Sequence, residues 1–131
     1  MKILQPPDWP RPKGYSNGIS ARGQLVFVSG IVGWNQQGEF VAMDFAGQVD
    51  QALQNIVAIL KEANARPEHI VRITWYVLDK NEYMGSTQEI GTSYRTIIGK
   101  HYPAMTVVQV AGLVEENARV EIEVTAVIPE S

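Results

Sequence analysis

The chain has 131 residues, of which 45% are hydrophobic and 19% are charged, and this is the size and balance of one globular domain. Its net charge of −3 disfavours binding to a nucleic-acid backbone, although it leaves room for a local basic patch. The absence of cysteine excludes disulfides, thiolate nucleophiles and zinc–thiolate sites, and the presence of only two histidines disfavours a histidine-rich metal cluster.

Residues 1–13 predict an extended arm. Four of the seven prolines lie at positions 6, 7, 10 and 12, and because proline has no amide donor we expect no strand ladder here. The arm is either disordered or lies across a surface, and Trp9 favours a surface because an indole is costly to leave in water. The apolar run Ile3–Leu4 is too short for a signal peptide, and no run reaches the roughly 18 residues of a membrane span. We therefore expect a cytoplasmic protein.

The next segment predicts a β-hairpin. Residues 15–21 alternate polar and apolar side chains, the triplet RGQ is a turn signal, and residues 25–32 form a run rich in β-branched residues. The residues that follow, 33–43, contain two glycines and an asparagine and predict a loop.

Two helices are predicted, and the first has the clearer pattern. Residues 45–63 place apolar side chains at spacings of three and four, with Asp44 as the N-cap. Residues 83–99 carry a weaker apolar stripe, and Gly85 and Gly91 each cost it about 1 kcal/mol relative to alanine.

Three further strands are predicted at residues 70–78, 106–113 and 119–128. The first is almost continuously apolar, which indicates that both of its faces are covered. We assign to one side of it Val71, Ile73, Trp75 and Val77, and to the other Ile70, Tyr76 and Leu78. The last strand alternates strictly, with Val120, Ile122, Val124 and Ala126 on one side and Arg119, Glu121, Glu123 and Thr125 on the other.

The predicted order is ββ-α-β-α-β-β, which indicates an α+β domain over residues 14–131 in which two helices lie on one face of a mixed sheet. Two helices can cover only one face. Because neither side of residues 70–78 is polar, we expect the second face to be buried against other copies of the chain.

Two carboxylates, Glu121 and Glu123, share one side of the last strand and are candidates for general acid–base chemistry. The alternative is a strand face that is solvated or on which these side chains form salt bridges with Arg119.

Other candidates also have structural interpretations. Ser29 and Gly30 end a predicted strand, where a glycine lets a ligand approach backbone amides but is more often a bulge or turn. Tyr15 has a hydroxyl for a ligand but is also a packing residue. A lone histidine, His101, is typical of a surface or cap, and Met105 is typical of a core.

Taken together, four segments resemble the RidA family, also called YjgF, the reactive-intermediate deaminases that act on enamines and imines. They are LVFVSG (25–30), QVDQALQNIVAILKEANARPEHIVRITWYVLD (48–79), YPAMTVVQVAGL (102–113) and VEIEVTAV (120–127). The resemblance implies a chorismate-mutase-like α+β fold and a homotrimer with small-molecule clefts between neighbouring subunits. It also implies hydrolysis of imines to carbonyl compounds and ammonia without a metal or organic cofactor.

The resemblance also implies a set of site residues. Glu121, the first glutamate of VEIE, matches the glutamate that orients the attacking water. Tyr15 matches the family's site tyrosine, and Ser29 and Gly30, with the amide of Ile31, match the strand end that meets the ligand.

Two positions depart from the family pattern. Where the family has an arginine that grips the substrate carboxylate, this chain has Met105 in the sequence PAMT. A helix position that is often asparagine in deaminating members matches Gly91. A small 2-imino acid therefore fits poorly, and Arg72, Arg95 and Lys100 are candidates for a replacement cation.

Two functions remain open at this point. One is a deaminase for a non-standard imine, with Glu121 as the catalytic residue and Tyr15, Ser29, Gly30, Ile31, Gly91 and Met105 as the binding residues. The other is a non-catalytic small-molecule-binding or regulatory protein on the same trimer, which the missing arginine favours. RNA binding, which has been described for family members, is disfavoured by the net negative charge and the lack of a basic aromatic stripe.

Overall fold

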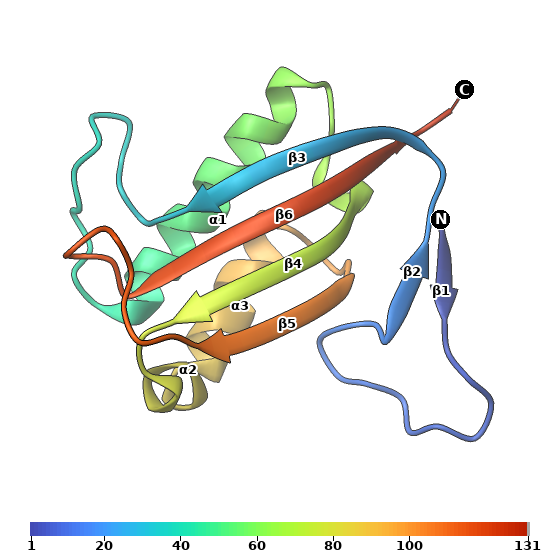
Figure 1. Cartoon of the computed structure of the whole chain (residues 1–131), viewed down its shortest axis with the longest axis horizontal. Helices are drawn as coiled ribbons and strands as arrows, with labels where there is room; N and C mark the ends of the chain where they lie inside the picture. Colours follow the sequence, from blue (N-terminus) through green and yellow to red (C-terminus); the bar gives the residue numbers. More distant parts are fainter. Residues whose placement is uncertain (131) are drawn as a thin grey trace.

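The computed structural model describes residues 1–130, and its elements are labelled in Figure 1. The strands are β1 (Lys2–Leu4), β2 (Gly18–Ser20), β3 (Gly23–Ile31), β4 (Ile70–Val77), β5 (Ala104–Gln109) and β6 (Val120–Pro129). The helices are α1 (Phe45–Glu62), α2 (Lys80–Gly85) and α3 (Thr87–Ile97), with a short 3₁₀ turn at Pro67–His69.

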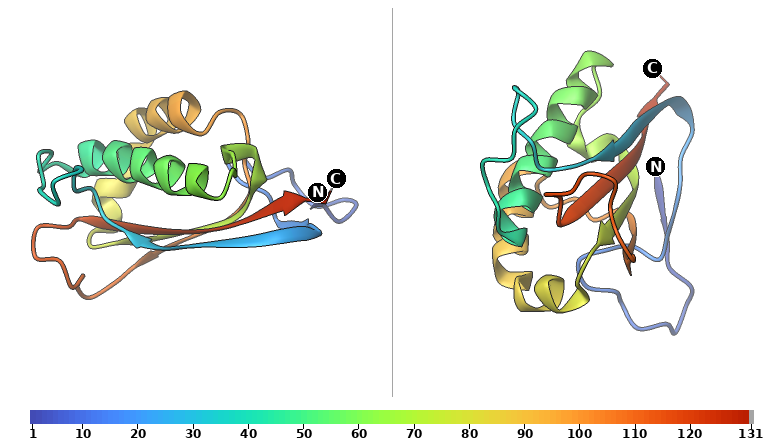
Figure 2. Two further views of the ribbon diagram at one scale, coloured as in Figure 1. Left: turned by 90° about the horizontal axis from the view of Figure 1, so that it is seen from above. Right: turned by 60° about the vertical axis from the view of Figure 1, so that its left-hand side comes forward.

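The main sheet has four strands in the order β3-β6-β4-β5. Strand β4 pairs in parallel with β5 and antiparallel with β6, and β6 pairs antiparallel with β3, so the sheet is mixed as predicted. Seen from above, α1 and α3 lie on one face of this sheet and leave the other face open (Figure 2). The apolar core lies between the helices and the sheet.

The predicted hairpin is wrong. Strand β2 pairs with β1 at the end of the arm, and β3 pairs instead with β6. The prediction that residues 1–13 form no ladder is also wrong for Lys2–Leu4, because the first proline, Pro6, lies beyond this strand. The arm is therefore held to the chain by a small sheet of its own.

The second predicted helix is two helices. Asp79 caps α2 by accepting a hydrogen bond from the backbone of Asn81 at 2.9 Å, so this helix begins earlier than predicted. Ser86, whose φ and ψ are −116° and 15°, separates α2 from α3 directly after the weak helix former Gly85. The first helix is confirmed: α1 ends one residue early, and Asp44 is its N-cap.

A β-bulge in β4 reverses the predicted sides of its first residues. The register moves from Ile70 paired with Ala126 to Arg72 paired with Thr125, so one extra residue stands on β4. Ile70 therefore lies in the core, and the open side of β4 carries Arg72, Thr74 and Tyr76. This side is polar, contrary to the prediction. The exposed apolar side chains of the open face come mainly from β3, where Leu25 is 58% and Phe27 is 72% exposed.

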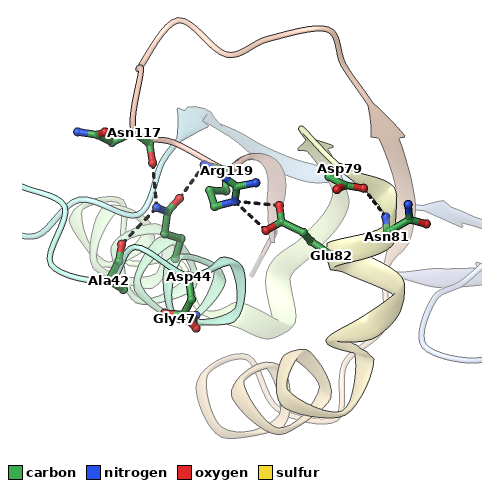
Figure 3. Close-up of polar contacts among 9 residues, drawn as sticks. Ala42, Asp44, Gly47, Asp79, Asn81, Glu82, Asn117 and Arg119 are labelled. Atoms are coloured by element: carbon green, nitrogen blue, oxygen red, sulfur yellow. Dashed lines mark hydrogen bonds and ion pairs between the residues drawn. The ribbon is translucent and has the colours of Figure 1, made fainter.

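Gln48 joins α1 to the loop before β6. Its side chain is fully buried, donates to the carbonyls of Ala42 and Asn117 at 3.2 and 2.9 Å, and accepts from the Arg119 amide at 2.7 Å (Figure 3). Gly33 packs on the backbone of Gln48, where a Cβ would lie 2.7 Å from its carbonyl oxygen. The hydrogen bond from the Arg119 amide to Gln48 thus ties α1 to the residue directly before β6, the strand that carries Glu121.

Candidate functional site

The first half of the site is a bulge at the end of β3. The register moves from Val28 opposite Val124 to Ile31 opposite Ile122, so Ser29 and Gly30 together stand where one residue would fit. Bulges re-aim side chains and are common beside active sites. The strand-end glycine is thus a bulge, and this structural interpretation is compatible with a role in binding.

Glu121 lies directly over the bulge. Its carboxyl carbon is 2.7 Å from the place where a Cβ on Gly30 would stand, so the bare Cα of the glycine makes room for the carboxylate. Glu121 is partly buried and also lines a small open cavity of about 260 Å³ beside Leu113 and Val114. A carboxylate that is half-exposed beside apolar groups can hold a water molecule.

Glu123 has a different environment. The hydroxyl of Tyr76 donates to Glu123 Oε1 at 2.5 Å. This hydrogen bond is the main reason that the pKa of Tyr76 is raised above its ordinary value, with desolvation and the negative charges of Glu123 and Glu121 adding to it. The two carboxylates that share a strand face therefore differ, because Glu123 has a fixed partner.

Arg119 does not pair with either carboxylate. Its Nε lies 2.8 and 2.9 Å from the two carboxylate oxygens of Glu82 on α2 (Figure 3). The hydrogen bond to Glu82 is the main cause of the raised pKa of Arg119. The alternative in which Arg119 neutralises the strand face is thus wrong, and no ion pair within residues 1–130 involves Glu121.

The second half of the site is a cavity between α3, the start of β5 and the arm. It has a volume of about 660 Å³, and Gly91 and Met105 both line it. Arg95, one of the three proposed replacement cations, lies in the same cavity, whereas Lys100 and Arg72 line other cavities. Of the three cations named from the sequence, Arg95 is the one that lines the cavity with Met105, and the sequence alone offers no means of choosing it.

The walls of this cavity are aromatic. Tyr94 stacks on Tyr102 with ring centroids 5.5 Å apart, and Trp75 meets Tyr83 edge to face at 6.2 Å. Burial raises the pKa of both Tyr83 and Tyr94, and the negative charge of an ionised Tyr102 adds to the effect on Tyr94. From the sequence, Tyr83 and Tyr94 belong to the apolar stripe of the second predicted helix and Trp75 to an apolar strand, and neither pattern distinguishes a core side chain from the wall of a cavity.

Tyr15 lies in the adjoining cavity, which it shares with Lys100, His101 and the arm and which also reaches Tyr102. The ring of His101 is in hydrogen-bond contact with the carbonyl of Ile70 at 2.7 Å, so His101 has a structural partner. Tyr15 is thus beside the Met105 half of the site and not beside Glu121.

The two halves lie on opposite faces of the sheet. Met105 pairs in register with Ile73, whose side chain is in the core, so Met105 is on the helix side. Glu121 pairs with Tyr76 and lines an open-face cavity with it. One copy of the chain therefore cannot bring both halves against one small molecule.

No group of three or more His, Asp or Glu side chains within residues 1–130 is arranged to hold a metal ion. In the same part of the chain, none of the helices has the length and apolar character needed to cross a membrane.

Comparison with known proteins places the chain in a family. A family model described as Endoribonuclease L-PSP matches residues 10–128. A RutC family protein of Aquifex aeolicus is 34% identical over 128 residues, which make up 97% of this chain and 99% of the relative. The chain belongs to the RidA/YjgF family.

Two further RidA-family relatives bear on activity and on fold. A 2-iminobutanoate/2-iminopropanoate deaminase of Escherichia coli K12 is 30% identical over 116 residues, or 86% of each chain. The solved structure of YyfB from Yersinia pestis, described as a Rid-family protein of unknown function, superposes with a TM-score of 0.84. The two chains are 27% identical, and the match covers 97% of this chain and 98% of the Yersinia pestis chain. The structural similarity therefore extends into the arm.

Proposed function

We propose that this RidA-family chain hydrolyses an imine or enamine to a carbonyl compound and ammonia, in a cleft between two copies of a homotrimer. The observation that carries the proposal is the separation of Glu121 and Met105 on opposite faces of one sheet. A neighbouring copy supplies the second half, with residues 14–131 of each copy as the catalytic domain and residues 1–13 as an arm near the cleft.

In this reaction water adds across the C=N bond. The Glu121 carboxylate accepts a proton from the water while the water oxygen bonds to the imine carbon, and the imine nitrogen takes up a proton from the solvent. Glu121 then gives its proton to the nitrogen of the resulting carbinolamine, which leaves as ammonia, while the C=O bond forms and the hydroxyl proton passes to the solvent. The amides of Ser29, Gly30 and Ile31 hold the polar end of the substrate, and Tyr15 contacts it from the other half.

Met105 sets the kind of substrate. A charge-assisted hydrogen bond is worth roughly 1.5–3 kcal/mol, so the absence of an arginine at this position costs a small 2-imino acid roughly 10- to 150-fold in transition-state binding. The apolar thioether instead favours a larger or aromatic group.

The test generates imines with an amino-acid oxidase and follows how fast semicarbazide traps them. The wild type is expected to remove imines with large side chains, and Glu121→Gln is expected to lose turnover while remaining trimeric. Glu123→Gln is the matched control, because it neutralises a carboxylate on the same strand face that is bound to Tyr76. Equal turnover in wild type and Glu121→Gln would contradict the proposal.

A second candidate function is a non-catalytic ligand-binding or regulatory protein, and Met105 is the observation that favours it. It predicts tight binding without turnover for every imine. Met105→Arg discriminates between the two: activity gained on small 2-imino acids indicates intact catalytic groups, whereas an inert variant supports the binding protein.

A further inference from the structure

The cavity beside Met105 is lined by two positive groups, Lys13 on the arm and Arg95 on α3, and neither forms an ion pair within residues 1–130. The ion pairs within residues 1–130 are Arg66–Glu68 and Arg119–Glu82, so Arg95 has no carboxylate partner there. Arg95 is an exposed residue in the last turn of α3, and it lines this cavity together with Gly91 and Met105.

Gly91 allows this position of Arg95. A Cβ on Gly91 would stand 3.0 Å from Arg95 Nη1, closer than such contacts normally are. The glycine costs the helix about 1 kcal/mol relative to alanine. In return, the guanidinium can lie beside Gly91, one turn before its own Cα, where the same cavity is lined by Tyr94 and Tyr102.

The walls complement a flat apolar group. Besides Tyr94 and Tyr102, which stack on each other, Met105 contributes a flexible thioether that makes favourable contacts with ring edges. Trp75 is 2% exposed, and its Nε1 is the one buried side-chain nitrogen or oxygen of residues 1–130 without a hydrogen-bond partner. A cavity with an unpaired guanidinium and these walls fits a molecule that is anionic at one end and aromatic at the other.

We propose that this cavity binds an aromatic carboxylate, with Arg95 holding the carboxylate and with Met105, Tyr94 and Tyr102 packing the ring. Arg95 is then the specificity-determining residue of the site, and Gly91 positions it. The inference rests on the proposed function in that the substrate becomes an imine whose carbon skeleton carries both an aryl group and a carboxylate.

The test measures binding alone, by calorimetry, with three probes. Phenylacetate carries the ring and the charge, phenylacetamide is its neutral analogue, and acetate has the charge without the ring. Phenylacetate is expected to bind at least about 10-fold more tightly than either of the others.

Substitutions of single residues test whether Arg95 holds the carboxylate of phenylacetate. Arg95→Gln is expected to lower phenylacetate affinity about 10-fold, to the level of the amide, and Arg95→Lys is expected to recover part of the loss. Gly91→Leu, which places a side chain where the guanidinium lies, is expected to lower the affinity as well. Lys100→Gln removes the same charge from the neighbouring cavity and is expected to leave the affinity unchanged.

The proposal is overturned if Arg95→Gln binds phenylacetate as the wild type does, if the amide or acetate binds equally well, or if the wild type binds none of the probes. Glu121→Gln separates this result from the proposed function, because it is expected to lose turnover and keep phenylacetate binding. If phenylacetate binding depends on Arg95 but the protein turns over no imine, the proposed deaminase function is wrong and this inference stands. If the wild type turns over an imine, and Arg95→Gln has the same KM and the same affinity for phenylacetate, this inference is wrong and the proposed function stands.

Discussion

The carboxylate of Glu121 occupies the space that a side chain on Gly30 would need. A Cβ there would overlap Oε2 and lie 2.7 Å from Cδ of Glu121. Gly30 is therefore a glycine because of a neighbour on β6 and not because of its own φ, which is not positive.

This relationship predicts that Gly30→Ala acts through Glu121. We expect Gly30→Ala to lower imine turnover at least about 10-fold and to destabilise the fold by about 1–3 kcal/mol, because the added methyl group forces the carboxylate aside. In a Glu121→Ala background the same change meets no carboxylate and is expected to cost less than about 0.5 kcal/mol.

Urea unfolding of the two single variants and the double variant measures this coupling. Additive effects would show that the carboxylate and the glycine are independent. The oligomeric state of each variant, measured in parallel, controls for changes in assembly.

Gln48 makes three hydrogen bonds to backbone groups from a fully buried position. Gln48→Leu is expected to destabilise the fold by about 2–5 kcal/mol, since each buried group left without a partner costs about 1–3 kcal/mol. Gln54→Leu, on the exposed side of the same helix, is expected to change stability by less than about 0.5 kcal/mol. Equal urea midpoints for the two variants would contradict this account of the loop before β6.

Alkaline pH is expected to weaken the fold through its tyrosines. The pKa values of Tyr76, Tyr83 and Tyr94 are raised in the folded chain above the ordinary value of 10.0. A raised pKa means that the folded state holds the phenolic proton more tightly, so this stabilisation is complete below about pH 10 and is lost as the pH rises through the folded values.

Thermal unfolding between about pH 8 and pH 11 measures this loss. Tyr94→Phe, which removes the hydroxyl that donates to the His101 carbonyl, is expected to cost about 1 kcal/mol at neutral pH and to reduce the alkaline loss. Tyr15→Phe serves as the control because Tyr15 is 43% exposed. An identical alkaline loss in wild type and Tyr94→Phe would contradict the assignment.

The open face of the sheet predicts where the copies meet. Phe27 is 72% exposed on β3, and its neighbour on the same side, Leu25, is 58% exposed. Phe27→Glu is expected to convert the trimer into monomers, because it places a charge in an apolar interface. Ile59→Glu, on the outer side of α1, is expected to remain trimeric. Sedimentation at micromolar concentration distinguishes these outcomes, and a monomeric wild type would contradict the trimer itself.

Periodicity was sufficient for the elements whose environment is regular. The spacing of apolar residues in α1 and the strict alternation of β6 are confirmed to within a residue or two at their ends. The same patterns predicted the alternation of strands and helices along the chain, but they did not predict the order of the strands within the sheet. The residues alone make Glu121 and Glu123 candidates and indicate a bulge or turn at Gly30, and only the resemblance favours Glu121 over Glu123, because the two glutamates share one strand face.

The predictions that were wrong depended on contacts between residues that lie far apart in the sequence. The bulge at Val71 is set by pairing with β6, so the sides of Ile70 and Arg72 could not be assigned from β4 alone. The pairing of β2 with β1 depends on how residues 5–17 bring the chain back beside Lys2–Leu4. The position of Arg95 depends on a glycine one turn earlier and on a cavity formed by three separate segments.

The proposed division of the site between the two faces of the sheet means that two impaired chains can restore each other. A chain with Glu121→Gln lacks one half of the cleft, and a chain with Arg95→Gln lacks the other. When equal amounts are unfolded together and reassembled at random, about one quarter of the clefts receive an unaltered half from each parent. Activity that exceeds the sum of the two parents would come from mixed trimers alone, and the same two substitutions combined in one chain would abolish it.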